Sequence, residues 1–281
     1  MGLIGGSLGW QLKNTGNYRI YGRDALHQHE QWALRKGLMD EVMTDHIIPS
    51  LDGIIVAVPV DVLAPTVHYF LDRINPRAWI TDTGSIKHPL AGSIASHPRR
   101  AQVVLAHPIA GTEYSGPGAA LPDLFSGKIN ILCDTDQSAA FALDAVRELF
   151  ARELGMEIHH MDAATHDRHI AYVSHLSHVS AFMLGKTVLD NEPDEQNIFL
   201  MAGSGFASTV RLAKSSPHTW TPIFSGNRRH LLPVLRDYVK NLELCIDLLE
   251  ENNTQKIREL LTQINYIGDI IDRIQGKHGK Q

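Results

Sequence analysis

The chain begins with the glycine-rich stretch Met1–Trp10 (MGLIGGSLGW). A dinucleotide-binding turn uses one glycine to turn sharply, a second to let the pyrophosphate approach the backbone, and a third to pack a helix on a strand. Gly2 and Gly5 fit the second and third positions, and a helix beginning near Gly6–Ser7 would direct its N-terminal amides at the phosphates. The first glycine and its strand would precede Met1. We therefore expect Met1 to be an internal residue of a longer protein, and the nucleotide-binding domain to be incomplete at its start.

An acidic residue stands where such a turn needs one. Asp24 ends the segment YRIYGRD, roughly twenty positions after Gly5, where a carboxylate would bind the hydroxyls of the adenine-side ribose. This acid favours NAD over NADP. Arg23 beside it leaves a second interpretation open, because an arginine here either pairs with a 2′-phosphate or lies in solvent as a loop charge.

Composition sets the broad class. With 281 residues, 43% hydrophobic and 20% charged, the chain is typical of a globular protein of two domains. A formal net charge of -5 and the lack of a long basic run argue against nucleic acid as a partner. The two cysteines, Cys133 and Cys245, indicate neither a disulfide framework nor a cysteine metal motif. No apolar run reaches the ~18 residues of a membrane span and no signal peptide is evident, so we expect a cytoplasmic protein.

The first half alternates short β-rich runs with helical patterns, the rhythm of a parallel sheet covered by helices. The run GIIVAV is apolar nearly throughout, which is typical of a strand buried on both faces. Such sheets bind ligands at the carboxyl ends of their strands. The expected strands are Tyr18–Tyr21, Gly53–Val58, Ala78–Thr81, Val103–Ala106, Ile129–Cys133 and Glu157–His160, and the expected helices include Ala25–Lys36, Pro65–Ile74 and Ser138–Leu154.

Strand signals end after about Ala163. Ile170–Leu189 and Leu231–Ile274 carry apolar residues at helical spacing, with a break near Glu251–Thr254 (ENNT). Their apolar content suits a homodimer interface, or alternatively packing on the first domain. We predict an α/β fold in which a Rossmann-type parallel-sheet domain, residues 1–162, is followed by an all-helical dimerisation domain, residues 163–281.

Three downstream regions carry chemically capable side chains. TDTGSIK (Thr81–Lys87) and HPIAGTEYSG (His107–Gly116) come just after predicted strands, which places them at the ligand-binding edge of the sheet. SHLSH (Ser174–His178), followed by STVRLAKSSPHTW (Ser208–Trp220), lies in the helical half. A site shared by all of them would be a cleft between the domains.

These motifs, with GLIGGSL and the Asp24 position, resemble in order and spacing the prephenate dehydrogenase family, the prephenate and arogenate dehydrogenases of tyrosine biosynthesis. The similarity covers nearly the whole chain, and HPIAGTE with the arginine segment is its most specific part. No chorismate mutase or regulatory ACT domain is evident, so we expect the monofunctional core. The resemblance implies oxidation of prephenate by NAD: hydride leaves C4, the C4 hydroxyl loses its proton, and CO2 departs to give 4-hydroxyphenylpyruvate. This chemistry needs no metal and no covalent nucleophile.

The resemblance also implies roles for individual residues. His107 would accept the proton of the C4 hydroxyl, because neutral imidazole titrates near the operating pH. Ser85 would lie close to that hydroxyl and to His107. Arg211 would clamp a substrate carboxylate through two parallel hydrogen bonds. The remaining substrate-pocket residues would be His178, Thr112, Glu113 and Trp220, and the cofactor-binding residues would be Gly2, Leu3, Ile4, Gly5, Asp24, Val58, Pro59 and Gly84.

Other interpretations remain open at this stage. His107 can be a structural cap of a strand end, and Arg211 an ordinary surface residue. His166, His169, His175 and His178 offer pairs three positions apart that suit a metal, with His159 and His160 nearby, although no HExxH motif is present. The alternative functions are an arogenate dehydrogenase, a ligand-binding dimer that is catalytically impaired by its truncated start, and a β-hydroxyacid dehydrogenase, which would use a catalytic lysine.

Overall fold

Strands and helices alternate in the first half of the protein, and helices follow. The computed structural model describes residues 1–191 and 196–278, and within these ranges the last strand ends at Met161. Up to that point the elements are α1 (Leu3–Asn14), β1 (Tyr21–Gly22), α2 (His27–Arg35), β2 (Glu41–Val42), β3 (Gly53–Val56), α3 (Val60–Leu71), β4 (Trp79–Asp82), α4 (His88–Ile94), β5 (Val103–Pro108), β6 (Ile129–Cys133), α5 (Ala140–Arg147) and β7 (Glu157–Met161). After it come α6 (Ala163–Ile170), α7 (Leu176–Asn191), α8 (Gln196–Leu200), α9 (Ser204–Thr209), α10 (Pro217–Gly226), α11 (Arg228–Glu250) and α12 (Thr254–His278).

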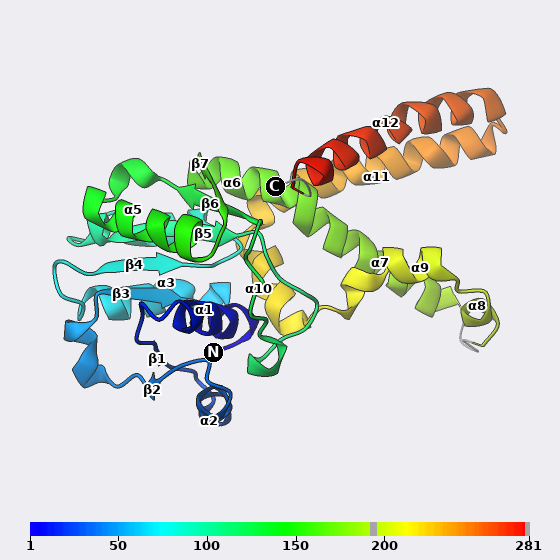
Figure 1. The fold of residues 1–281 in the computed structure, drawn as a ribbon. Coiled ribbons are helices and arrows are strands. Elements are labelled where there is room, and N and C mark those ends of the chain that lie inside the picture. The colour runs from blue at the N-terminus through cyan, green and yellow to red at the C-terminus, as the bar shows by residue number, and fades with distance from the viewer. Residues whose placement is uncertain (192–195, 279–281) are drawn as a thin grey trace. The chain divides into compact units, whose positions relative to one another are not determined.

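Five strands form the main sheet, in the order β3-β4-β5-β6-β7 (Figure 1). The strands β3, β4 and β5 run parallel, as do β6 and β7, but β5 and β6 are antiparallel. This one reversal departs from the parallel sheet that the sequence predicts. The chain leaves β5 and re-enters β6 at the same edge, because residues 109–128 contain only the short 3-10 turn Pro117–Ala119 and no crossover helix.

Two hydrophobic cores cover the two faces of this sheet. Because side chains alternate along a strand, Val103 and Leu105 of β5 join the core with α3 and α4, whereas Val104 and Ala106 join the core with α1 and α5. The helices lie on both faces in Figure 1. The predicted Rossmann-type domain, a sheet covered by helices on both faces, is thus confirmed, and the β5–β6 pair within it is antiparallel.

Several predicted boundaries shift. The strand expected at Tyr18–Tyr21 is the short β1, which pairs with the unpredicted β2 instead of the main sheet. The strand expected at Gly53–Val58 ends at Val56, because Pro59 caps α3 and the chain turns into that helix. Pro65, where the sequence predicts the helix to start, lies inside α3. After α5, the predicted helix continues as a π-helical turn, Glu148–Glu153.

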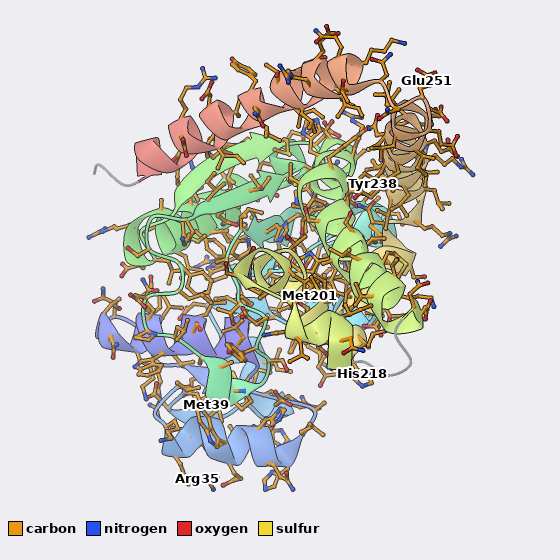
Figure 2. The ribbon with its side chains drawn as sticks, turned by 90° about the vertical axis from the view of Figure 1, so that its right-hand side faces the viewer. Arg35, Met39, Met201, His218, Tyr238 and Glu251 are labelled. Carbon is orange, nitrogen blue, oxygen red and sulfur yellow. The ribbon has the colours of Figure 1, made fainter. Side chains whose placement is uncertain are left out.

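The protein divides into two compact units, Met1–Arg228 and Arg229–Gln281. The second unit consists of α12 and nearly all of α11. The predicted break is confirmed, because α11 ends at Glu250 and α12 begins at Thr254, with Asn252 in a left-handed conformation at φ 50°. Figure 2 shows Glu251 at this turn. Within the described ranges, no helix is both long and apolar enough to cross a membrane.

Candidate active site

The glycine stretch forms the beginning of α1. Gly2 is the N-cap in an extended conformation, no side chain caps the helix, and no acidic residue occupies its first turn. The helix begins at Leu3, earlier than the sequence predicts, so Gly5 and Gly6 lie inside it. A Cβ on Gly2 would have no atom within 4 Å, which leaves its backbone open to approach. The free amides of Leu3 and Ile4 therefore offer a site for an anion, and the donor set suits a pyrophosphate.

The position in α1 that must be a glycine for packing is Gly9, and not Gly5 as predicted. A Cβ on Gly5 would lie 3.4 Å from the Cβ of Ala57, an ordinary contact. A Cβ on Gly9 would lie 2.1 Å from the carbonyl oxygen of Leu38, which no side chain can tolerate. The proximity of Gly5 to Ala57 does bring the first turn of α1 next to the carboxyl end of β3.

Asp24 lies beside the glycine stretch. Its Oδ2 accepts a hydrogen bond from the amino group of Met1 at 2.5 Å, and its Oδ1 accepts one from the backbone N–H of Leu26 at 2.9 Å. The neighbouring Arg23 donates to Asp45 Oδ1 at 2.8 Å. Arg23 is therefore paired with a carboxylate of the protein, whereas Asp24 lies beside Met1, at the start of the glycine stretch.

The other predicted cofactor residues follow β3 and β4 at the same edge of the sheet. Val58 and Pro59 connect β3 to α3, and Gly84 follows β4. In the register between these parallel strands, Val56 pairs with Asp82, so the two strands end side by side. Gly84 donates its N–H to Asp82 Oδ2 at 2.8 Å, and a Cβ there would lie 2.6 Å from Leu63.

A buried ion pair joins the ends of β4 and β5. Lys87 and Asp82 are both fully buried, and the Lys87 ammonium donates to Asp82 and to the carbonyl oxygen of Ala106. Asp82 Oδ1 in turn accepts the N–H of Ala106 at 3.2 Å. The backbone N–H and carbonyl oxygen of Ala106, the residue before His107, are thus both held by this pair. Both residues stand in the motif TDTGSIK, but no role was predicted for either; the signal is a pair of opposite charges that flanks a turn in an apolar segment.

His107 lies near the end of β5 and is half-buried. Its Nδ1 is 2.8 Å from His166 Nε2, and His166 Nδ1 is 2.8 Å from Asp167 Oδ1. Burial, followed by the charges of His166, Lys87 and His175, holds the pKa of His107 well below 6.5. The imidazole is therefore neutral at physiological pH, as a general base must be.

Asp167 and Asn227 connect this histidine pair to the surrounding elements. Asp167 accepts the backbone N–H of Lys87 at 2.7 Å and that of His88 at 2.9 Å. Asn227 Nδ2 donates to the carbonyl oxygen of Asp167 at 2.7 Å and to His175 Nδ1 at 3.1 Å. Burial lowers the pKa of His175 to about 4. From the sequence, His166 and His175 are predicted only as possible metal ligands, and Asp167 and Asn227 are not predicted at all, because their partners lie far away in the chain.

The helical segments contribute an aromatic stack. His178 lies flat against Trp220, with ring centroids 3.4 Å apart and an interplanar angle of 22°. His175 meets the same indole edge-on at 6.0 Å. His178 Nδ1 is 3.0 Å from the carbonyl oxygen of Ser174, and so it carries the proton and leaves Nε2 as an acceptor. Burial lowers the pKa of His178, and the charge of Arg211 lowers it further.

Arg211 and Glu113 form a pair in spite of their distance in sequence. Arg211 Nη1 is 3.5 Å from Glu113 Oε2, and the two side chains are 54% and 23% exposed. Neither is buried in the manner of Lys87 and Asp82. The exposed guanidinium of Arg211 can therefore bind a second anion beside Glu113.

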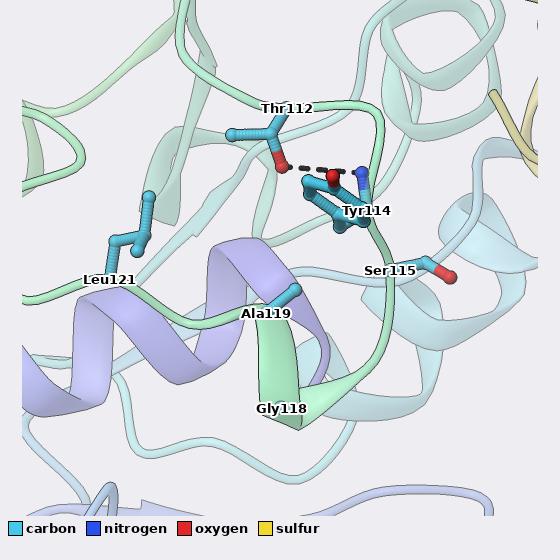
Figure 3. A pocket seen from close by; sticks show the side chains of 6 residues that line it. All are labelled: Thr112, Tyr114, Ser115, Gly118, Ala119 and Leu121. Atoms are coloured by element: carbon cyan, nitrogen blue, oxygen red, sulfur yellow. Dashed lines mark hydrogen bonds between the residues drawn. The ribbon is translucent and has the colours of Figure 1, made fainter. Parts of the chain in front are cut away.

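Thr112 and Ser85 occupy less defined surroundings. Thr112 accepts the N–H of Tyr114 at 3.3 Å and borders a cavity of about 450 Å³ with Tyr114, Ser115, Gly118, Ala119 and Leu121 (Figure 3). No other predicted site residue lines this cavity. Ser85 is half-buried, and its hydroxyl makes no hydrogen bond to the residues that the structure describes.

Most of the predicted residues thus fall into three groups. One surrounds His107, a second comprises His178, Trp220 and Arg211 with Glu113, and a third lies at the start of α1 with Asp24. The edge contact of His175 with Trp220 links the first two groups through Asn227 and Asp167. Within the described part of the chain, no group of three or more His, Cys, Asp or Glu residues could hold a metal ion.

Comparison with known families matches nearly the whole chain. Residues 8–158 match the family model described as "Prephenate dehydrogenase, nucleotide-binding domain". Residues 162–263 match the model described as "Prephenate dehydrogenase, dimerization domain".

Individual relatives carry three related names. The chain is 30% identical over 205 residues to a cyclohexadienyl dehydrogenase of Zymomonas mobilis, covering 72% of this chain and 70% of that protein. It resembles the crystal structure of prephenate dehydrogenase from Aquifex aeolicus in complex with hydroxyphenyl propionate and NAD+, with a TM-score of 0.88, 28% identity and 96% of each chain covered. It also resembles the Synechocystis arogenate dehydrogenase, with a TM-score of 0.79, 26% identity, and 96% of this chain and 97% of that one covered.

Proposed function

The chain belongs to the prephenate dehydrogenase family, and we propose that it catalyses the NAD-dependent oxidative decarboxylation of prephenate to 4-hydroxyphenylpyruvate. One observation carries the proposal. His107, at the carboxyl edge of the nucleotide-binding sheet, has a pKa held well below 6.5 by burial and by its charged neighbours. It is therefore available as a neutral base at the edge where a parallel sheet binds its ligands.

The proposed reaction assigns the proton to His107. Its Nε2 accepts the proton of the C4 hydroxyl, and CO2 leaves as the ring becomes aromatic. The Ser85 hydroxyl makes no hydrogen bond to the described residues, and Ser85 lies between Asp82 and Lys87, the pair that holds both backbone groups of Ala106. We assign Ser85 the role of orienting the substrate hydroxyl.

Arg211 binds a carboxylate of the substrate. Its guanidinium is 54% exposed and 3.5 Å from Glu113, so it can turn one edge of its planar fork to a new anion. His178, Trp220 and Thr112 form the remaining pocket wall in this proposal. The stacking of His178 on Trp220 supports it, because the stack presents a flat surface beside Arg211 that suits a six-membered ring.

NAD fits the residues at the start of α1. Gly2, Leu3, Ile4 and Gly5 would hold its pyrophosphate, Asp24 its adenine-side ribose, and the connections at Val58, Pro59 and Gly84 would border it. When bound, NAD supplies the acceptor for the hydride. The pairing of Arg23 with Asp45 at 2.8 Å supports NAD over NADP, because that arginine is already neutralised by a carboxylate.

Prephenate is favoured over arogenate by the state of Glu113. Arogenate carries an ammonium group where prephenate carries a keto group, and an unpaired carboxylate would recognise that ammonium. Glu113 is instead paired with Arg211. The names of the relatives include both substrates, so this pairing is the argument for prephenate.

We further propose a homodimer formed through the helical domain, with the domains divided at residues 1–162 and 163–281. The matched family model of residues 162–263 is described as a dimerization domain. The long helices α11 and α12 leave many large apolar side chains exposed, which is the mark of an interaction surface. These include Leu242, Ile246, Leu249, Leu261, Ile264, Ile267 and Ile271.

Steady-state rates with prephenate and arogenate, each with NAD and NADP, test the proposal. We expect the highest kcat/KM for prephenate with NAD. Equal or greater efficiency with arogenate would overturn the substrate assignment. Binding of NAD and prephenate without NADH formation would indicate a ligand-binding protein and would overturn the proposed activity.

A further inference from the structure

We propose that His166 and Asp167 are positioning residues that fix His107 in the tautomer with a proton on Nδ1 and a free lone pair on Nε2. The inference rests on the proposed function, in which Nε2 receives the substrate proton. It extends that function by assigning two residues to the orientation and charge of the base.

The direction of each hydrogen bond can be followed from the carboxylate outward. Asp167 is 1% exposed and accepts the backbone N–H groups of Lys87 and His88, so it is fixed as an acceptor. His166 Nδ1, 2.8 Å away, must therefore donate to it. In a neutral imidazole the other nitrogen is then an acceptor, and His166 Nε2 accepts from His107 Nδ1 at 2.8 Å. Nε2 of His107 is left without a proton.

This arrangement selects the less common form of the base. A free imidazole in water carries its proton mainly on Nε2, the nitrogen that the proposed reaction needs to be empty. No residue that the structure describes hydrogen-bonds Nε2 of His107. Only the bond from Nδ1 to His166 holds the tautomer.

The supporting groups are fixed on several elements. Asp167 lies on α6, and its carboxylate binds the first residues around α4. Its backbone carbonyl accepts from Asn227, which also donates to His175. His166 is 2% exposed. Because His166, Asp167 and Asn227 are buried and hydrogen-bonded, rotation of the His166 ring would break two contacts and leave buried polar atoms without partners.

The same contacts stabilise the product of proton transfer. When Nε2 of His107 receives the proton, the imidazolium keeps its Nδ1–H bond to His166. Asp167 is the negative charge at the end of this chain, whereas burial and the nearby charges of His166, Lys87 and His175 disfavour a positive charge on His107. Asp167, acting through His166, therefore offsets part of the cost of charging a buried imidazole.

Two variants of His166 form a matched pair. In His166→Gln, the amide oxygen replaces Nε2 as an acceptor for His107. In His166→Asn, the shorter amide reaches Asp167 but not His107. We expect His166→Gln to retain kcat within ~10-fold and His166→Asn to lose ~10²–10⁴-fold, the usual range for loss of general base catalysis. KM for NAD should be unchanged in both.

The pH profile separates positioning from a merely structural role. In His166→Gln the link to Asp167 is lost, so the acid limb of kcat/KM should move to lower pH while the thermal midpoint stays close to that of His166→Asn. Equal losses in the two variants, or an unmoved acid limb, would overturn the proposal.

A measurement on the wild-type protein is independent of activity. In the long-range 15N–1H spectrum of protein labelled at histidine, His107 should show a protonated Nδ1 and an unprotonated Nε2 at neutral pH. A protonated Nε2 would mean that His166 donates to His107, and would overturn the inference. If the wild type oxidised neither prephenate nor arogenate while the spectrum showed the expected tautomer, the proposed function would fail and the positioning network would stand.

Discussion

Replacement of Lys87 by methionine should lower the free energy of unfolding more than removal of any surface charge in the protein. Lys87→Met keeps the length of the side chain but removes the ammonium that donates to Asp82 and to the carbonyl oxygen of Ala106. Both charged side chains are fully buried. Removing one partner leaves the other charge uncompensated, and breaking a buried pair in this way costs about 3–5 kcal/mol.

An exposed pair in the same protein supplies the control. Lys186 and Asp190 are 2.6 Å apart on α7, with side chains 63% and 56% exposed. An exposed helical pair of this spacing contributes only about 0.3–0.5 kcal/mol. Lys186→Met should therefore unfold at nearly the wild-type urea concentration, whereas Lys87→Met should unfold at a much lower one.

The assay is urea unfolding at pH 7 followed by circular dichroism. The double variant Asp82→Asn/Lys87→Met should recover part of the loss, because the buried carboxylate is then uncharged. A loss below ~1 kcal/mol for Lys87→Met would refute the reasoning. So would a double variant whose loss relative to wild type equals the sum of the losses of Lys87→Met and Asp82→Asn measured singly, since the two groups would then act independently.

Four further predictions follow from the site and the surfaces. His107→Asn should reduce kcat by ~10²–10⁴-fold with little change in thermal midpoint; near-normal turnover would exclude it as the base. Arg211→Ala should raise KM for prephenate. The loss of binding energy should lie near the lower end of the ~2–5 kcal/mol typical of charge pairs, because the guanidinium is 54% exposed. An unchanged KM would show that Arg211 does not bind the substrate. Burial lowers the pKa of His175 from 6.5, its ordinary value, to about 4 in the folded protein, so the unfolded state takes up its proton first as the pH falls below 6.5. Stability should therefore drop by about 2 kcal/mol between pH 7 and pH 5, and His175→Gln should show a smaller drop in urea unfolding. Ile267→Glu, at a 58% exposed position on α12, should shift sedimentation from dimer to monomer, and an unaltered dimer would exclude this face.

Local sequence patterns were sufficient for most of the architecture. The apolar run of β3 and the β-branched run of β5 predict buried strands because their side chains alternate between two cores. The break at ENNT predicts the turn between α11 and α12 because no apolar residue there continues the helical spacing. These signals depend on neighbours close in the chain, which a sequence displays directly.

The pairing between strands was harder to predict from the sequence than the strands themselves. The reversal at β6 depends on where residues 109–128 return to the sheet, and nothing within β6 itself distinguishes a parallel from an antiparallel strand. Similarly, β2 is too short to give a periodic signal and forms only because it pairs with β1. Long-range geometry decided both cases.

The candidate site likewise contains residues that local motifs identify and residues that only contacts distant in the chain identify. His107, Arg211 and Trp220 stand in recognisable motifs, and so the resemblance could assign them. No role could be predicted for Asp167. Its carboxylate is held in place only in the fold, where it accepts the backbone N–H groups of Lys87 and His88, about eighty positions earlier in the chain. A lone His–Asp dipeptide on a helix is ordinarily a solvated pair.

Burial strengthens the electrostatic effect of the His166–Asp167 dipeptide on His107. In water, the charge of Asp167 would be screened from His107 by the intervening solvent and would contribute little to its tautomer. Here His166 is 2% exposed and Asp167 1% exposed, so the carboxylate acts through a single ring across two hydrogen bonds of 2.8 Å. In the proposed arrangement, the same burial that lowers the pKa of His107 strengthens the contacts that decide which of its nitrogens carries the proton. A base assembled this way depends on the packing of α6 against α4 as much as on the imidazole itself.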